Sequence, residues 1–290
     1  EHTVYQWRRK YVRANKKGVV PTLTANMGRG GHNVPMIKNT KGILYKKGGK
    51  IIENKQRELI KNLNELPIPK REFLDFEKYL SPPGIIKGYA MNRTASIIFS
   101  RGCPFNCIYC GNRLMWKGYF RRRSPEKVIE EVEYLVRRYK VKGVYFLDDN
   151  FTTGIDWVRE FCQRMREKNF GIVWGCNSRV DTLTDEMLKE MKSAGCIQLD
   201  FGVESGSDKV LKALNKRTTR EKIEKAFELV KKHKLRTMAS FMFGNPEEDE
   251  EDIQQTFDLV RKIKPNFVSF FFLVPLPGTE LYKLAKENKW

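Results

Sequence analysis

Long apolar runs are missing from this chain of 290 residues. The longest, Phe267 to Pro275, is interrupted by Ser269 and is far too short to cross a bilayer. The first residues contain no apolar segment of the signal-peptide type, so neither a leader nor a membrane span is expected. Six cysteines in a chain of this size do not indicate a disulfide scaffold. These absences favour a protein of the reducing cytoplasm.

Acidic residues are also in short supply, and the imbalance is uneven. The chain has 55 Lys and Arg against 35 Asp and Glu, a formal net charge of +20. Residues 1–80 hold 18 basic and 7 acidic residues, a net +11, while the rest hold 37 and 28, a net +9. A basic arm can bind nucleic acid through its phosphates, and it can equally be a solvated surface. Nucleic acid is therefore a candidate partner of the N-terminal region.

Three cysteines on one short segment form the most specific pattern. Cys103, Cys107 and Cys110 are spaced so that their thiols can converge from a single loop. Thiolates are soft ligands that suit zinc and iron–sulfur clusters. Zinc needs a fourth ligand, usually from a second Cys or His pair downstream, and no such pair follows. A four-iron cluster is favoured, because three cysteines would leave one iron open to a small molecule.

The flanking residues extend this pattern. Ser100-Arg101-Gly102 precedes the first cysteine, Tyr109 lies inside the last Cys-x-x-Cys, and residues 121–126 read Arg-Arg-Arg-Ser-Pro-Glu. With these neighbours, about residues 42–290 resemble the radical S-adenosylmethionine (SAM) superfamily. The resemblance implies that Cys103, Cys107 and Cys110 hold a [4Fe–4S] cluster. It also implies that SAM chelates the open iron and is cleaved by one electron to give a deoxyadenosyl radical.

From Thr94 the chain alternates short β-rich runs with amphipathic helices, which is typical of a parallel α/β fold. Strands are expected at 95–99, 143–147, 172–176, 197–203, 237–243 and 267–274. Helices are expected to begin at Ser124-Pro125, at Thr184 and at the capping box Thr218-x-x-Glu221. The fold class predicted is α/β, a partial (β/α)6 TIM-like barrel with a small irregular basic N-terminal extension. Its functional residues should follow the carboxyl ends of the strands.

The resemblance assigns roles to polar residues near these ends. Tyr109 would lie near the adenine of SAM, with a core aromatic as the alternative. Asp148 and Asp149 follow the second strand, where the family receives the amine of SAM. A carboxylate near an ammonium group is physically sensible. Which aspartate serves is open, and capping of the next helix by Asp149 or Asn150 is the alternative.

Further residues come from the later strands. Glu204 and Ser205 match the position that contacts the ribose hydroxyls or the carboxylate of SAM. Arg179 could meet that carboxylate or form a surface ion pair. Gly244 and Pro246 would shape the backbone near the adenine. No residue is assigned as the catalytic group that acts on the substrate.

The first residues carry a second resemblance. Residues 4–35 include the run 21–28 (Pro-Thr-Leu-Thr-Ala-Asn-Met-Gly) and are similar to part of the DNA-recognition region of DNA cytosine methyltransferases. Arg29 departs from the threonine usual in that family. Its nucleophile and cofactor motifs are absent from the sequence, so base-flipping chemistry is not expected. Residues 1–40 are expected to be an orphan basic segment, poorly ordered or draped on the rest.

Residues 41–88 are expected to form a linker to a core barrel at 89–290 that is truncated at its C-terminal end. Apolar residues around a glycine pair predict a hairpin over 43–52, and apolar spacing predicts a helix over 57–66. Residues 62–69 (Asn-Leu-Asn-Glu-Leu-Pro-Ile-Pro) are similar to the linker of cobalamin-binding radical SAM proteins. The signature of their cobalamin domain is absent from this chain. Cobalamin is therefore a candidate cofactor whose binding domain is not expected here.

The function favoured is that of a radical SAM enzyme for methylation or rearrangement of a carbon centre. Such an enzyme needs a one-electron donor such as flavodoxin or ferredoxin, and the sequence does not name the substrate. RNA methylthiotransfer is an alternative, but it needs three more cysteines upstream, and residues 1–102 contain none. A non-catalytic iron–sulfur carrier and a DNA-binding fusion are the remaining alternatives.

Overall fold

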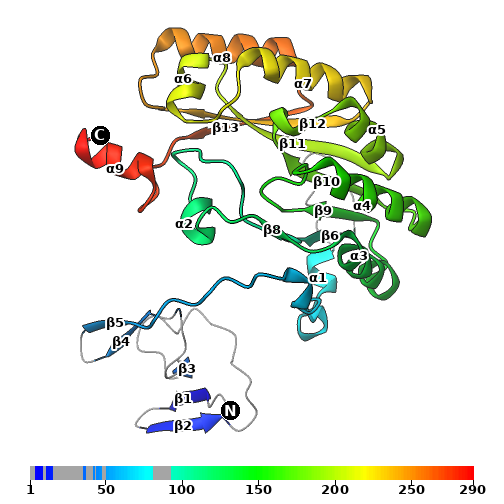
Figure 1. The fold of residues 1–290 in the computed structure, drawn as a ribbon, viewed down its shortest axis with the longest axis vertical. Helices are drawn as coiled ribbons and strands as arrows, with labels where there is room; N and C mark the ends of the chain where they lie inside the picture. Colours follow the sequence, from blue (N-terminus) through cyan, green and yellow to red (C-terminus); the bar gives the residue numbers. More distant parts are fainter. Residues whose placement is uncertain are drawn as a thin grey trace. The chain divides into compact units, whose positions relative to one another are not determined.

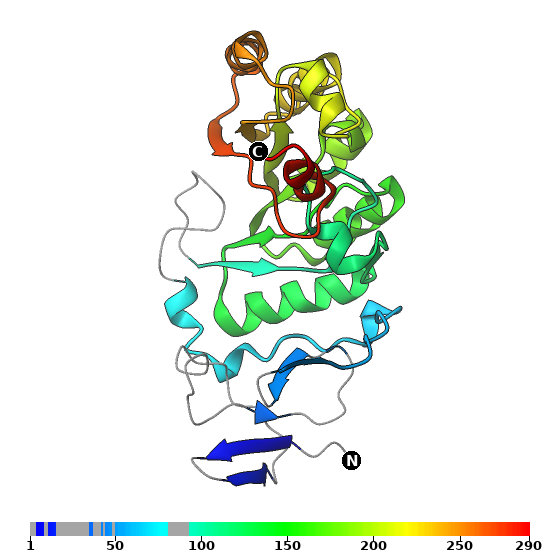
Figure 2. The same cartoon turned by 90° about the vertical axis from the view of Figure 1, so that its left-hand side faces the viewer.

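Two units make up the chain, Glu1–Ile60 and Lys61–Trp290, in a computed structural model (Figures 1 and 2). The structure describes residues 4–8, 11–15, 35–36, 42, 44–47, 50–80 and 93–290. In the first unit β1 (Val4–Arg8) pairs antiparallel with β2 (Tyr11–Asn15) and with β3 (Pro35–Met36). The run at 21–28 that resembles a DNA-recognition loop lies outside the described residues.

The hairpin predicted over 43–52 is confirmed, but the helix predicted after it is wrong. Strands β4 (Leu44–Lys47) and β5 (Lys50–Glu53) pair antiparallel. Residues 54–60 have no regular structure, and only the 3-10 turn η2 (Leu63–Glu65) follows. The side chain of Asn62 accepts the N–H of Asn64, whose own side chain accepts the N–H of Ser124 at 2.8 Å. The side chain of Asn62 thus takes the N–H of Asn64, which a helix over 57–66 would use, and Asn64 ties the turn to the start of α3 instead.

The end of the linker is fixed to the barrel by charge. Helix η3 (Arg71–Phe73) and helix α1 (Glu77–Leu80) follow η2. Arg71 Nη2 lies 2.6 Å from Glu131 Oε1, and Arg123 binds the other oxygen of the same buried carboxylate. Residues 81–92 lie outside the described residues.

Six parallel strands form the sheet of the second unit, which confirms the predicted partial barrel. Their order is β13-β12-β11-β10-β9-β6, so the sheet runs without closing in the described chain. The strands are β6 (Thr94–Ile97), β9 (Gly143–Phe146), β10 (Val173–Ser178), β11 (Cys196–Glu204), β12 (Arg236–Phe243) and β13 (Phe267–Phe272). A short antiparallel pair, β7 (Ser100–Arg101) and β8 (Arg121–Arg122), comes between β6 and β9 in the sequence.

Helices follow the outer side of this sheet (Figure 1). They are α3 (Pro125–Tyr139), α4 (Ile155–Lys168), α5 (Asp185–Ser193), α6 (Asp208–Ala213), α7 (Arg220–Lys232) and α8 (Glu250–Ile263), with the turn η4 (Val180–Thr182) after β10. On the other side lie α2 (Asn112–Trp116) and α9 (Glu280–Glu287). None of the helices in the described ranges has the length and apolar character needed to cross a membrane.

The helix starts predicted from capping residues are largely correct. Ser124 and Thr184 accept the N–H groups of Lys127 and Met187, so both are N-caps. The predicted start at Thr218 is wrong by one residue, because Thr219 caps α7 and Thr218 is buried.

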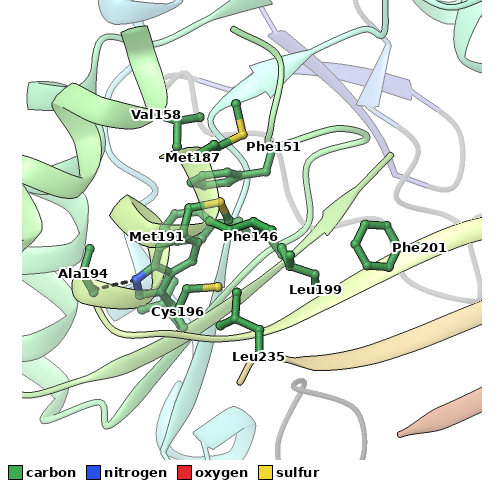
Figure 3. Close-up of a cluster of buried hydrophobic side chains, with 14 of the residues drawn as sticks. Phe146, Phe151, Val158, Met187, Met191, Ala194, Cys196, Leu199, Phe201 and Leu235 are labelled. Carbon is green, nitrogen blue, oxygen red and sulfur yellow. Dashed lines mark hydrogen bonds between the residues drawn. The ribbon is translucent and has the colours of Figure 1, made fainter. Parts of the chain in front are cut away.

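Aromatic and sulfur-containing side chains fill the space between sheet and helices (Figure 3). Phe146 and Phe151 pack at 5.1 Å between ring centroids, surrounded by methionines of α5 such as Met187 and Met191. The indole N–H of Trp174 donates to the backbone oxygen of Ala194 at 2.8 Å. Burying this many apolar side chains fixes the sheet, and with it the positions of the loops at the strand ends.

Candidate functional site

The three motif cysteines line one cavity beyond the carboxyl ends of the strands. Its volume is about 140 Å³. The residues that line it are Cys103, Phe105, Cys107, Cys110, Asn112, Arg113, Asp149, Arg179 and Lys216. Cys103 and Cys107 are half-buried and Cys110 is exposed. Partial burial raises the pKa of the Cys103 and Cys110 thiols above the usual value.

The donor set fits a cluster better than a single ion. In the described part of the chain, no three His, Cys, Asp or Glu side chains surround one metal position. Zinc requires such convergence, since its ligands share one centre. A four-iron cluster binds each cysteine through a different iron, so its ligands stand farther apart around a shared cavity. Three thiols on one cavity wall therefore fit the cluster.

The cysteine loop, residues 103–110, is held from two sides. The N–H of Ile108 donates to the oxygen of Leu214 at 3.1 Å, and the oxygen of Ile108 accepts the N–H of Leu281 at 3.1 Å. Asn215 Nδ2 also donates to the oxygen of Asn106 at 2.8 Å. Ile108, Leu214 and Leu281 are all buried in a small apolar cluster. The segment after α6 and the start of α9 thus fix the loop that carries the thiols.

Arg179 lies against this loop and is buried. Its guanidinium carbon is 3.7 Å from the ring centroid of Phe105, and Nη1 is 3.8 Å from Cys107 Sγ. Nη2 is 2.7 Å from Asp181 Oδ2 and donates to the oxygen of Lys216 at 2.6 Å. Arg179 is therefore part of the cavity wall, and its ion pair is not on the surface.

Glu204, Tyr109 and Lys216 form a buried polar group at the end of β11. The Tyr109 hydroxyl donates to Glu204 Oε1 at 2.9 Å, and Lys216 Nζ lies 2.6 Å from the same oxygen. Burial and the neighbouring Glu204 charge raise the pKa of Tyr109 far above its usual value. The strand register shifts between Gly202 and Glu204, and Glu204 has a φ of +73°. Such a bulge re-aims a side chain at a strand end, and a non-glycine residue in this region stores strain.

Only one of the two aspartates after β9 reaches the cavity. Asp148 is buried and its Oδ1 accepts the N–H groups of Phe99 and Ser100, the first at 3.0 Å. Burial raises the pKa of Asp148 to about 7, although these hydrogen bonds oppose the shift. Asp149 lines the cavity and accepts a hydrogen bond from Asn112 Nδ2. Neither caps a helix, because α4 begins after Gly154.

Tyr109 and Glu204 do not line the cavity themselves and reach it through Lys216, which does. The remaining candidates also lie near strand ends without lining the cavity. Ser205 is buried with Oγ 3.2 Å from Thr256 Oγ1 and accepts the N–H of Ser207, so it faces α8. Gly244 and Pro246 follow β12, and the N–H of Gly244 donates to Glu248 Oε2 at 2.6 Å.

Lys216 and Arg113 are cavity residues that the sequence analysis did not find. Lys216 comes 12 positions after Glu204, across α6, so no local spacing links the two. The pattern Gly-x-Glu at the end of a predicted strand could have directed attention to basic residues nearby. It could not have selected Lys216 among the many lysines that follow.

Comparison with known proteins identifies the family. Residues 97–260, more than half of the chain, match the Radical SAM superfamily. An uncharacterized methyltransferase of Pyrococcus horikoshii is 34% identical over 252 residues, which cover 87% of this chain and 53% of that protein. The structure of OxsB, a cobalamin-dependent SAM radical enzyme, is similar with a TM-score of 0.71 at 19% identity over 86% of this chain and 41% of OxsB. At that identity the likeness concerns the fold.

A short part of the chain, 43 residues, matches a different protein. The type II methyltransferase M.Bsp6I of Bacillus sp. (strain RFL6) is 70% identical over 43 residues, 15% of this chain and 14% of that protein. In the larger matches the chain spans about half the length of its curated relatives. By the match over most of its length, the chain belongs to the radical SAM superfamily.

Proposed function

We propose that this chain is the catalytic region of a radical SAM enzyme that methylates or rearranges a carbon centre. One observation carries the proposal: the three thiols of one loop line a single cavity at the strand ends. Superfamily membership brings a [4Fe–4S] cluster and SAM as cofactors. When bound, they supply one-electron cleavage of SAM to methionine and a deoxyadenosyl radical, which takes a hydrogen atom from a carbon.

The chain's own residues would bind and orient the cluster and SAM and would exclude water from the cavity. Cys103, Cys107 and Cys110 would hold three irons, and the loop contacts at Ile108 keep the thiols in place. Asp149 is the aspartate suited to accept the SAM amine, because it lies in the cavity wall. Asp148 would act indirectly, by fixing the backbone at the end of β6.

The other end of SAM would meet the polar group at β11. We assign the ribose hydroxyls to Glu204, since a carboxylate can accept both, and the adenine to Tyr109. Arg179 and Lys216 supply positive charge at the cavity, which suits the SAM carboxylate. Gly244 and Pro246, which follow β12, would border the adenine. Ser205 would hold the backbone next to Glu204 through its contacts with Thr256 and Ser207.

Anaerobic reconstitution tests the proposal. The wild-type chain should take up about four irons, as expected for one [4Fe–4S] cluster, and should release deoxyadenosine when reduced in the presence of SAM. Cys107→Ala should lose both properties. Cys162→Ala is the matched control, because Cys162 is buried in the core and should leave iron uptake intact. Iron uptake by Cys107→Ala equal to that of the wild type would contradict the assignment.

Methyl transfer with cobalamin is the specific chemistry we favour. The supporting observations are the name of the Pyrococcus relative and the resemblance of residues 62–69 to the linker of cobalamin-binding members. Hydroxocobalamin and [methyl-²H₃]SAM added to the reduced chain should yield labelled methylcobalamin if the chain binds cobalamin without the domain whose signature it lacks. Deoxyadenosine release without labelled methylcobalamin would contradict this chemistry for the chain by itself. Free cysteines throughout the described chain suit a reducing cytoplasm, where a flavodoxin or ferredoxin can deliver the electron.

The basic N-terminal residues have a second candidate role, DNA binding. It is favoured by the 70% identity over 43 residues to a type II methyltransferase, by the resemblance of residues 4–35 to a DNA-recognition region and by the excess charge of residues 1–80. A mobility-shift assay across a salt series, with and without residues 1–40, separates this role from unspecific attraction. Equal binding by both forms would exclude it.

A further inference from the structure

The cysteine loop lies in a long part of the sequence that lacks acidic residues. Between Lys78 and Pro125 there is no Asp or Glu, while nine residues are Lys or Arg: Lys78, Lys87, Arg93, Arg101, Arg113, Lys117, Arg121, Arg122 and Arg123. Of these cations, Arg113 lines the cavity together with Cys110. A surface of one sign beside a cofactor site steers partners of the opposite charge.

A defined surface carries the charge, which we name the Trp116 face: Arg101, Met115, Trp116, Lys117, Tyr119 and Arg121. The guanidinium carbons of Arg101 and Arg121 lie 5.8 and 5.4 Å from the ring centroid of Trp116. Burial and the charge of Arg101 lower the pKa of Arg121, as expected where two cations share one ring. Met115 and Tyr119 are 67% and 63% exposed. Arginine, aromatic residues and methionine are the types enriched in protein interfaces.

This face adjoins the cluster loop at both of its ends. Helix α2, which carries Trp116, begins two residues after Cys110 (Figure 1). At the other end, a Cβ on Gly102 would lie 2.0 Å from the backbone oxygen of Tyr119, so the two segments are pressed together next to Cys103. Arg113 joins the face to the cavity wall. Asn112, the first residue of α2, donates a hydrogen bond to the carboxylate of Asp149 in the cavity wall, which also links the face to the cavity.

We propose that the Trp116 face is the docking surface for an acidic protein that donates one electron to the cluster. The inference rests on the function proposed above. One electron leaves the reduced donor, which is oxidised by one unit, and enters the cluster, whose charge falls from 2+ to 1+. No bond forms and no proton moves. Nucleic acid suits this face less well, because two guanidinium groups already lie close to its one tryptophan ring and would compete with a base for it.

Reduced plant-type ferredoxin, an acidic one-electron carrier, is the probe. The variant Lys117→Glu/Arg121→Glu reverses two charges on the face, and Lys189→Glu/Lys231→Glu makes the same change on α5 and α7. At low salt the first variant should accept electrons from ferredoxin at least 10-fold more slowly, within the usual range of electrostatic steering. Its iron content and its reduction by dithionite should equal those of the wild type. The control variant should match the wild type in all three.

Two further measurements test the Trp116 face independently of the double variant's folding and of cluster assembly. Met115→Glu changes one exposed side chain and should slow the ferredoxin reaction even if the double variant does not fold. Oxidised ferredoxin should bind the cluster-free wild-type chain in a salt-dependent manner and bind the double variant at least 10-fold more weakly, so failure of cluster assembly does not affect this readout. Equal ferredoxin rates and affinities in wild type and face variants overturn the inference, as does an equal loss in the control. RNA binding by the wild-type chain and the double variant is measured in parallel. If the double variant loses RNA binding while its ferredoxin binding is unchanged, the face binds nucleic acid and the inference is overturned.

Discussion

The ammonium group of Lys216 lies 2.6 Å from Oε1 of Glu204, and both side chains are more than nine-tenths buried, at 7% and 9% exposure. The Tyr109 hydroxyl completes the group, 3.3 Å from Lys216 Nζ. Each charge therefore compensates the other in a place with little solvent. Because both residues belong to the proposed SAM site, the pair stabilises the site before the cofactor binds and offers two charged groups to it afterwards.

Removing one partner of this pair should be costly. Lys216→Met leaves a buried carboxylate without its cation, and we expect the free energy of unfolding to fall by about 3–5 kcal/mol. Urea unfolding of the cluster-free chain measures this. Lys225→Met is the control, because its pair with Glu221 is exposed and screened by solvent, so its loss should leave the free energy of unfolding almost unchanged. The double variant Lys216→Met/Glu204→Gln should regain most of the loss, and a loss that persists unchanged would contradict the pairing.

Gly102 should be intolerant of any side chain, for two separable reasons. It has a φ of +93°, and a Cβ would lie 2.0 Å from the oxygen of Tyr119. Gly118, in the same segment, has a φ of +77° with nothing near its would-be Cβ. Gly118→Ala should cost about 1 kcal/mol through backbone strain alone. Gly102→Ala should cost more and should also lower iron uptake on reconstitution, since the shift occurs next to Cys103. Equal effects of the two changes on unfolding and iron uptake would exclude the contact.

The barrel could be predicted because its strands are short apolar runs between amphipathic helices. Strand β9 is buried at every position, which is what a central parallel strand requires. The cysteine loop could be predicted because its spacing is local. Lys216 could not, because its partner is defined by the bulge at Gly202 and by the path of α6. Local spacing also failed at 57–66, where the Asn62 side chain accepts the N–H of Asn64 that the predicted helix would have used.

The same limit applies to the aspartates after β9. The sequence placed Asp148 and Asp149 side by side at a strand end, and alternation along a strand sends neighbours to opposite sides. Which of them faces the cavity depends on the folded backbone after β9, and in the structure it is Asp149. Asp148 is used inside the fold, where it accepts the backbone N–H groups of Phe99 and Ser100.

Asp148 should make stability depend on pH. Its pKa of about 7 in the folded chain exceeds the ordinary value of 3.8, so the folded state holds a proton that the unfolded state has lost between these values. Stability from this group is complete below pH 4 and is lost as the pH rises to 7, by at most about 1.4 kcal/mol per pH unit. Asp148→Asn should remove this slope in urea unfolding of the cluster-free chain between pH 4.5 and 7.5. Parallel curves for variant and wild type would show that Asp148 ionises normally.

Glu131 should hold the linker to the barrel through its two arginines. Its carboxylate is 2% exposed and binds Arg71 at 2.6 Å and Arg123 through the other oxygen. Glu131→Gln leaves two buried guanidinium groups without a counter-charge, and the free energy of unfolding should fall by about 3–5 kcal/mol. Glu130→Gln, one residue earlier on α3, breaks only a half-exposed pair with Lys127 and should cost less than about 1 kcal/mol. Hydrogen exchange at residues 71–73 should accelerate in the first variant alone, because the released Arg71 no longer ties η3 to α3; equal exchange in both variants would mean that apolar packing holds the linker.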